Sequence, residues 1–361
     1  MVVVPDIRFE DLKTSTLTMM VYSNINIDLK RMYDYLPIYE VDVPLTKKKH
    51  YPDVRKIVAP YGSIISLRYI DDFRGVISKP DVIVKRDLRD KLYRKEQFTS
   101  NDMDTIRSYG RKELKKHRKN HTHDTAEHTD DDLYEIGVKY LTSVQHFRNQ
   151  VTCIVTLANN KKVNIMVFNN SYKIVGCRSE KQAEECIMIL WEAYIRNFPS
   201  MWTKLDTNPP RFVFEKVMIN IGFKLGFHIV RSAFNEILND TKYRNVVHIS
   251  KFVSTGTTSV NTKFYPVHPA DFAYYCLEYP KWEDTVQPTF IRLTANPYQG
   301  KSRPKKEKDT TVLSFYSSKI IMSGRYMKSL RDVFLFLMRV IRDNKDVVAE
   351  RLVSTDVPFV M

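Results

Sequence analysis

The chain has 361 residues, and its 57 Lys and Arg against 42 Asp and Glu give a formal net charge of +15, which favours an acidic partner such as nucleic acid. The low glycine count of 10 argues against glycine-rich nucleotide cradles, and four cysteines without a CxxC pair predict free thiols rather than disulfides or a zinc ribbon. The N-terminus lacks the apolar run of a secretory signal and no stretch is apolar enough to span a membrane, so we expect a soluble intracellular protein.

The first predicted elements are a strand and a short helix in residues 15–36, STLTMMVYSNINIDLKRMYDYL. A long insertion, residues 47–146, follows them. It holds a strand-like run, GSIISLRYI from residue 62, and a charged stretch, residues 111–137, whose closely spaced histidines are His117, His121, His123 and His128. Because no cysteines accompany these histidines and the flanking sequence shows no apolar face, we expect a solvated linker rather than a metal site.

Residues 163–196 predict a hairpin followed by a helix. An apolar run ends at Phe168, a turn follows, and the second strand carries Lys173 and ends near Gly176. The helix is predicted from apolar residues at one-face spacing, namely Ala183, Cys186, Ile187, Leu190, Trp191 and Tyr194.

The same order of features returns later in the chain. Residues 215–238 read as a strand and a short helix, and residues 310–343 read as a hairpin with Phe315, Lys319 and Gly324 and then a helix. The basic segment 299–311 before this hairpin is expected to lie in solvent or to touch phosphate. A repeated order predicts a duplicated unit whose two halves share one antiparallel sheet with helices on one face, the alternative being two unrelated hairpin–helix units.

These passages resemble the TATA-box-binding protein family. SFYSSKIIMSGR, residues 314–325, resembles the family stretch in which Phe is followed by a Ser-Gly turn, Lys, two aliphatics and Thr-Gly, and VFNNSYKIVGCRSE, residues 167–180, resembles its first-repeat equivalent. The likeness covers residues 11–37, 149–198 and 211–345, and divergent forms of this kind look similar to those of large DNA viruses.

The resemblance implies an α+β fold, a two-repeat saddle whose curved antiparallel sheet carries helices on its convex face. The first repeat would occupy residues 1–200, with the insertion at about 47–146 inside it. The second repeat would occupy residues 201–345, and residues 346–361 would form a C-terminal tail.

The resemblance also implies a DNA-binding concave face. Phe168 and Phe315 occupy the positions of the apolar wedges that kink DNA from the minor groove, and alignment of the preceding strands gives them Val151 and Val286 as mates, with Phe147 and Trp282 nearby. Candidate phosphate contacts are Lys173, Lys319, Arg178, Arg325 and Arg292, the last on the strand expected to lead into the second hairpin. Candidate base-edge contacts are Thr18, Asn220 and Ser323. The competing interpretation of each position is an ordinary strand residue.

No Walker A, GxSxG or HExxH motif is present, so we expect neither an enzyme nor a cofactor. The resemblance implies a general transcription initiation factor that binds and bends A·T-rich promoter DNA and recruits a TFIIB-like factor and RNA polymerase. Its place of action would be a nucleus or a cytoplasmic viral factory, with packaging in a virion as a further option. The alternative is a protein-interaction scaffold that keeps the saddle without bending DNA.

Overall fold

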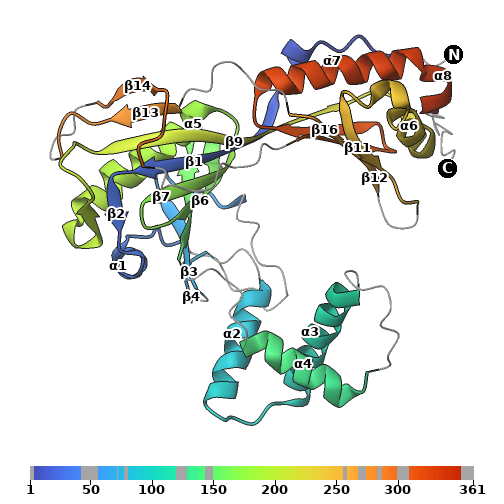
Figure 1. Cartoon of the computed structure of the whole chain (residues 1–361). Helices are drawn as coiled ribbons and strands as arrows, with labels where there is room; N and C mark the ends of the chain where they lie inside the picture. The colour runs from blue at the N-terminus through green and yellow to red at the C-terminus, as the bar shows by residue number, and fades with distance from the viewer. Residues whose placement is uncertain are drawn as a thin grey trace, which may run out of the picture.

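The computed structural model describes residues 4–41, 56–70, 72–76, 80–118, 128–142, 149–254, 258–266, 274–282, 287–298 and 309–350. A large, curved antiparallel sheet of 13 strands dominates this α+β structure (Figure 1). The strands of the first part of the chain are β1 (Thr14–Ser23), β3 (Ile64–Tyr69), β4 (Asp72–Gly75), β5 (Val151–Leu157), β6 (Lys161–Val167) and β7 (Ser171–Cys177). Those of the second part are β9 (Arg211–Lys224), β11 (Val247–Lys251), β12 (Ser259–Phe264), β13 (Tyr274–Glu278), β14 (Thr289–Leu293), β15 (Thr310–Phe315) and β16 (Lys319–Gly324).

Two small sheets and eight α-helices are described besides the large sheet, together with short 3-10 helices and one π-helical segment. The small sheets pair β2 (Ile25–Ile27) with β8 (Trp202–Lys204) and β10 (His228–Ile229) with β17 (Ala349–Glu350). The helices are α1 (Leu29–Tyr35), α2 (Pro80–Tyr93), α3 (Ser100–Arg118), α4 (Asp130–Thr142), α5 (Glu180–Met188), α6 (Arg231–Leu238), α7 (Met327–Asp343) and α8 (Lys345–Val348). No helix within the described ranges is long and apolar enough to span a membrane.

The strand order of the large sheet reads alike from its centre outwards in both directions. β1 and β9 pair at the centre; beyond β1 come β7, β6, β5 and β3, and beyond β9 come β16, β15, β12 and β11. Two additions break this symmetry. β4 extends the first half at its edge, and the β13–β14 hairpin pairs through β13 with the first residues of β9.

The helices α1, α5, α6 and α7 cover one face of the sheet and enclose a single large core. Alternate strand residues such as Leu17, Met19 and Val21 point into it, as the two-residue period of a strand requires. Five of the six residues of the predicted stripe are buried there and Tyr194 is half-buried. The stripe runs from α5 into a π-helical segment, Ile189–Tyr194, which continues the helix. The two predicted hairpins and all four predicted helices of the repeated passages are confirmed. The four cysteines are free thiols, as predicted, and all four are buried.

The insertion differs from the prediction. Its first strand, β3, pairs with β5 and occupies the sheet position that β11 occupies in the second half. The stretch expected to be a solvated linker is largely helical: residues 111–118 belong to α3 and residues 130–137 to α4, while 119–127 lie outside the described residues.

The helices α2, α3 and α4 form a separate unit with its own small core (Figure 1). Gly110 of α3 lies against the Leu133 carbonyl, and Gly137 of α4 against the Ile106 carbonyl, so a Cβ at either glycine would collide with the opposite backbone. This close crossing lets short apolar faces pack, which explains why the sequence pattern of either helix alone gave no sign of it.

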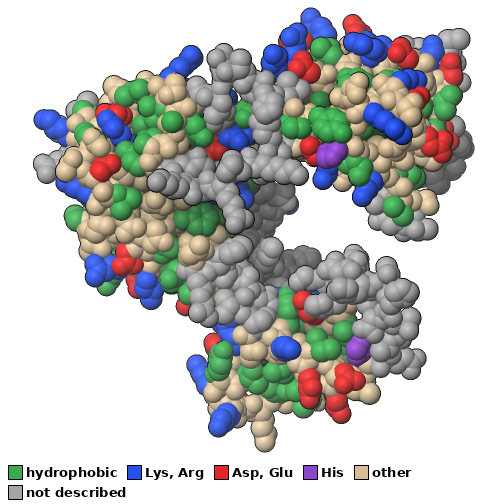
Figure 2. Space-filling view, viewed as in Figure 1, with side chains coloured by type: hydrophobic (Ala, Val, Ile, Leu, Met, Phe, Trp, Pro, Cys, Tyr) green, Lys and Arg blue, Asp and Glu red, His purple; other side chains and the backbone are tan. Residues whose placement is uncertain are grey.

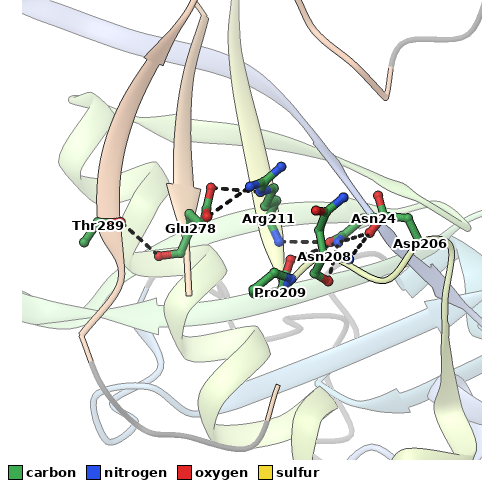
Figure 3. Close-up of polar contacts among 7 residues, drawn as sticks. All are labelled: Asn24, Asp206, Asn208, Pro209, Arg211, Glu278 and Thr289. Carbon is green, nitrogen blue, oxygen red and sulfur yellow. Dashed lines mark hydrogen bonds and ion pairs between the residues drawn. The ribbon is translucent and has the colours of Figure 1, made fainter. Parts of the chain in front are cut away.

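The connection between the two halves is fixed by a buried amide. Asn24, at the end of β1, donates to the Asp206 carboxylate at 2.8 Å and to the carbonyls of Asn208 and Pro209, and it accepts from the Arg211 backbone N–H at 2.9 Å (Figure 3). Arg211 in turn pairs with Glu278 of β13 at 2.8 Å. This network sets where β9 begins beside β1 and holds the β13–β14 hairpin against it.

Candidate nucleic-acid interface

The sheet face opposite the helices, here called the open face, is identified by strand alternation. In β6, Val163, Ile165 and Val167 enter the core, and in β15 buried residues alternate in the same way up to Ser314. The next residues, Phe168 and Phe315, therefore point to the open face. Both phenylalanines are half-buried and belong to none of the apolar clusters of the described residues.

Strand register makes the two phenylalanines equivalent. At the centre Thr18 pairs with Met218 and Asn220 with Thr16. Thr18 also lies opposite Val175, and Asn220 opposite Ser323. In the hairpins, Val175 pairs with Asn164 and Ser323 pairs with Thr311. Phe168 lies four residues after Asn164 and Phe315 lies four residues after Thr311, so the two phenylalanines occupy matching places. The positions predicted from the repeated sequence thus share one face and one place in each half.

The three candidate base-edge residues also lie together on the open face, near its centre. Asn220 and Ser323 are directly opposite each other and half-buried. Thr18 is only 3% exposed, so contact with a base would require neighbouring side chains to move aside. The Thr18 hydroxyl and the Asn220 side-chain oxygen are buried without a hydrogen-bond partner among the described residues, a costly state for polar atoms.

The candidate phosphate contacts Lys173 and Lys319 both point to the open face, but they are not equivalent. Lys173 lies opposite Met20, whereas Lys319 lies opposite Lys224, two residue pairs further from the centre of the sheet. The position equivalent to Lys319 is Ser171, whose carbonyl accepts from the Phe168 N–H across a turn of two residues, whereas three residues, 316–318, separate Phe315 from Lys319. Lys173 lies two residues beyond Ser171 along β7.

Three lysines that the sequence interpretation missed join Lys319 on the second half of the open face. They are Lys224 on β9, Lys251 on β11 and Lys263 on β12, and all are exposed. Lys224 and Lys319 are a directly opposed like-charge pair, an arrangement that destabilises a sheet unless an anion lies nearby. Each of the three lysines follows a buried residue, namely Phe223, Ser250 or Thr262, so each occupies an outward position of its strand.

Val151 does not lie where the wedge assignment placed it. Its side chain is fully buried in the main core, on the helix-covered face. Val286 lies outside the described residues. On the side away from β16, the neighbour of β15 is β12, not the strand around Val286 that the sequence predicted there. Trp282 stacks on Trp202 with ring centroids 5.3 Å apart, so it is held away from the open face.

Arg292 is also misplaced in the sequence interpretation. It lies on β14, which pairs with β13 and not with β15. Arg292 is opposite Tyr275, a residue that packs against the main core, so its exposed side chain emerges on the helix-covered face. Contact with a ligand on the open face is therefore excluded for Arg292 in this arrangement.

The two arginines just past the hairpins differ in their surroundings. Arg325 forms an ion pair with the buried Glu215 carboxylate at 2.6 Å and donates to the Lys216 carbonyl at 3.1 Å, so its charge is already neutralised. Arg178 is exposed beside the start of α5, whose first turn is capped by the Ser179 hydroxyl. Of the two, Arg178 is the better placed to meet phosphate.

The outer part of the open face is covered in the first half. Ile154 of β5 alternates with core residues, so it points to the open face, where it is buried with Ile57, Ile65 and Val76. The Asn160 side chain holds this cover by accepting from Ala59 N–H and donating to the Ile57 carbonyl.

Lys162 on the same face donates to the Thr156 hydroxyl and to Asn160, and burial lowers its pKa. Of the two lysines on the open face of β6 and β7, Lys173 is therefore the one not engaged with this cover.

Charge alone does not single out the open face, because Lys and Arg side chains also gather over α7 (Figure 2). Within the described ranges, no group of three or more His, Cys, Asp or Glu side chains could hold a metal ion, and three of the four clustered histidines fall where no side chain is described. The distinguishing features of the open face are thus its paired phenylalanines and its opposed lysines.

No protein-family model and no curated protein sequence matches the chain. Among solved structures, a TBP from Methanococcus jannaschii is similar to it with a TM-score of 0.29 and 12% sequence identity, over 53% of this chain and 80% of that chain. So loose a superposition carries no assignment by itself, and the functional conclusion below depends on the side chains of the open face.

Proposed function

We propose that the chain is a DNA-binding protein built as two repeats of the TATA-box-binding protein kind, and that its open face grips a duplex from the minor groove and bends it. The observation that carries this proposal is the equivalence of Phe168 and Phe315 on one face, beside exposed lysines. Apolar wedges unstack base steps at a cost of about a few kcal/mol per step, which a larger wrapped interface offsets.

The electrostatic part of the proposal depends on Lys224 and Lys319. Two like charges held directly opposite each other gain when a phosphate group lies between them. Each such contact releases counterions, so affinity should fall steeply with salt. In this function the protein would mark A·T-rich promoters and recruit a TFIIB-like factor and RNA polymerase, without catalytic chemistry of its own.

The second candidate function is a protein-interaction scaffold that does not bend DNA. It is favoured by the apolar cover over Ile154, which closes part of the open face, and by the burial of Val151 where a wedge mate was expected. The two candidates differ in whether a duplex bends when it binds.

The test is fluorescence-based binding and bending of an end-labelled A·T-rich duplex over a salt series. We expect tight, salt-sensitive binding with a large bend, and loss of the bend in the double variant Phe168→Ala plus Phe315→Ala. Phe290→Ala is the matched control, because Phe290 is 58% exposed on the helix-covered face. A straight duplex, bound equally by all three proteins, would favour the scaffold.

A further inference from the structure

A second candidate binding site lies on the helix-covered face, where a cavity of about 910 Å³ runs along α5. Its floor is one stripe of the helix: Lys181, Glu184, Glu185, Met188, Ile189 and Ala193. Steps of three or four residues link Lys181 to Glu184 and Glu185, then to Met188 and Ile189, and then to Ala193 in the π-helical continuation of α5, so all six lie along one side of the helix. A different stripe, with Ala183, Cys186, Ile187 and Leu190, faces the core.

The walls of this groove come from two segments far apart in the sequence. Tyr61, in the turn before β3, is 60% exposed, and Phe290, on β14, is 58% exposed. Phe290 is in place because β13 pairs with β9 and because Arg211 and Glu278 join the same two strands at 2.8 Å. Large apolar side chains exposed around a concave surface are typical of interaction sites.

The groove is acidic although the chain as a whole carries a net charge of +15. Glu184 and Glu185 line it, and burial raises the pKa of the Glu184 carboxyl. Partial desolvation, together with a hydrogen bond to Glu185, raises the pKa of Tyr61 to about 12. Lys181 in the groove and Arg292 two residues beyond Phe290 are nearby cations. A ligand with cationic flanks and an apolar centre would complement this arrangement.

We propose that this groove is the docking site for an amphipathic helix of a partner protein, with apolar anchors over Met188, Ile189 and Phe290 and with Lys or Arg beside Glu184 and Glu185. Residues 181 to 193 span roughly 18 Å at about 1.5 Å per residue, which fits a helix of about three turns. Helices bound in grooves place anchors at i, i+3 or i+4, and i+7. The small side chain of Ala193 permits close approach at one end. Because the groove and the open face lie on opposite sides of the sheet, a partner and a duplex can be bound together.

The test uses the full chain and a set of fluorescein-labelled, three-turn helical peptides with apolar anchors at these spacings and Lys or Arg flanks. A second set carries Glu in place of each Lys or Arg. Binding is followed by fluorescence anisotropy, without DNA, for wild type, Phe290→Ala and the double variant Glu184→Lys plus Glu185→Lys. Leu335→Asp is the control, because Leu335 is 49% exposed on α7, the corresponding helix of the second half.

We expect at least one basic peptide to bind wild type and Leu335→Asp equally. Binding should weaken by at least about tenfold in Phe290→Ala and in the charge-reversed variant, as truncation of an interface anchor does. The charge-reversed variant should instead gain affinity for the acidic peptides, a gain that a misfolded variant would not show. If no peptide binds below millimolar concentration, or if all four proteins bind alike, the proposal is wrong. The double variant Phe168→Ala plus Phe315→Ala should bind the peptide normally, which separates this result from the fate of the DNA proposal.

Discussion

The two halves of the sheet share one strand order but present different surfaces on the open face. In the second half, Lys224, Lys251, Lys263 and Lys319 are exposed there. In the first half, the cluster around Ile154 covers the outer strands, and Lys162 is engaged with Asn160. The core needs only one face of each strand, so the other face is free to diverge. If the open face binds DNA, the second half and the centre should dominate.

The largest expected effect concerns the buried ion pair of the second half. Replacing Arg325 with Met leaves Glu215, which is 3% exposed, without its 2.6 Å partner, and we expect a loss of about 3 kcal/mol in the free energy of unfolding. Urea denaturation measures it. Arg178→Met is the matched change in the first half and should alter stability by less than about 0.5 kcal/mol. Equal effects would mean that the Glu215 carboxylate does not depend on Arg325.

Removal of the opposed lysines tests the comparison directly. The double variant Lys224→Ala plus Lys319→Ala should bind a duplex about a hundredfold more weakly at about 0.1 M salt, and the slope of log affinity against log salt should fall by about two. Lys173→Ala, in the first half, should cost about tenfold and change the slope by about one. A larger loss from Lys173→Ala would reverse the proposed dominance of the second half.

Variants at Val151, in the core, and at Phe168, on the open face, distinguish loss of stability from loss of DNA bending in the first half. Val151→Ala should lower the free energy of unfolding by about 2 kcal/mol, because its side chain is fully buried, and should leave DNA bending unchanged. Phe168→Ala should have the opposite profile, with reduced bending and little loss of stability. Thermal or urea unfolding, measured beside a DNA-bending assay, distinguishes the two variants. If Val151→Ala reduced the DNA bend, the burial of Val151 in the core would be contradicted and its assignment as a wedge would be supported.

The smallest expected effect is on the free protein. Lys319→Glu replaces a like-charge pair with an attractive one, so it should stabilise the DNA-free fold by about a few tenths of a kcal/mol while weakening DNA binding. Urea midpoints at low salt are the measurement. A destabilised variant would show that the Lys224 and Lys319 side chains do not interact across the strands.

The sequence predicted most of the locally encoded structure. The two strand–turn–strand passages and the helices after them could be found because their apolar periods lie within short windows, and the equivalence of Phe168 and Phe315 followed from the repeat. Strand partners across long insertions could not be found in this way. Between β12 and β15 lie 45 residues, so the sequence predicted the nearer strand, which bears Arg292, as the neighbour of the second hairpin.

Other errors have physical causes of the same kind. The helical unit depends on contacts between α3 and α4 at Gly110 and Gly137, which no single-helix pattern reveals. The offset of Lys173 from Lys319 depends on the register of β7 against β1 and of β16 against β9, and the pairing of Arg325 depends on a carboxylate more than a hundred residues away. Each is a long-range contact, and the repeat pattern carries no information on it.

The most direct test of DNA binding on the open face uses a tethered DNA-cleaving iron chelate. All four native cysteines are buried, so a new cysteine can be labelled selectively. Asn261→Cys places the chelate on the open face of β12, and Leu335→Cys places it on α7. We expect the Asn261→Cys conjugate to cut a bound A·T-rich duplex at positions that face one minor groove, and the Leu335→Cys conjugate to leave it intact. Cleavage from Leu335→Cys alone would contradict a DNA site on the open face.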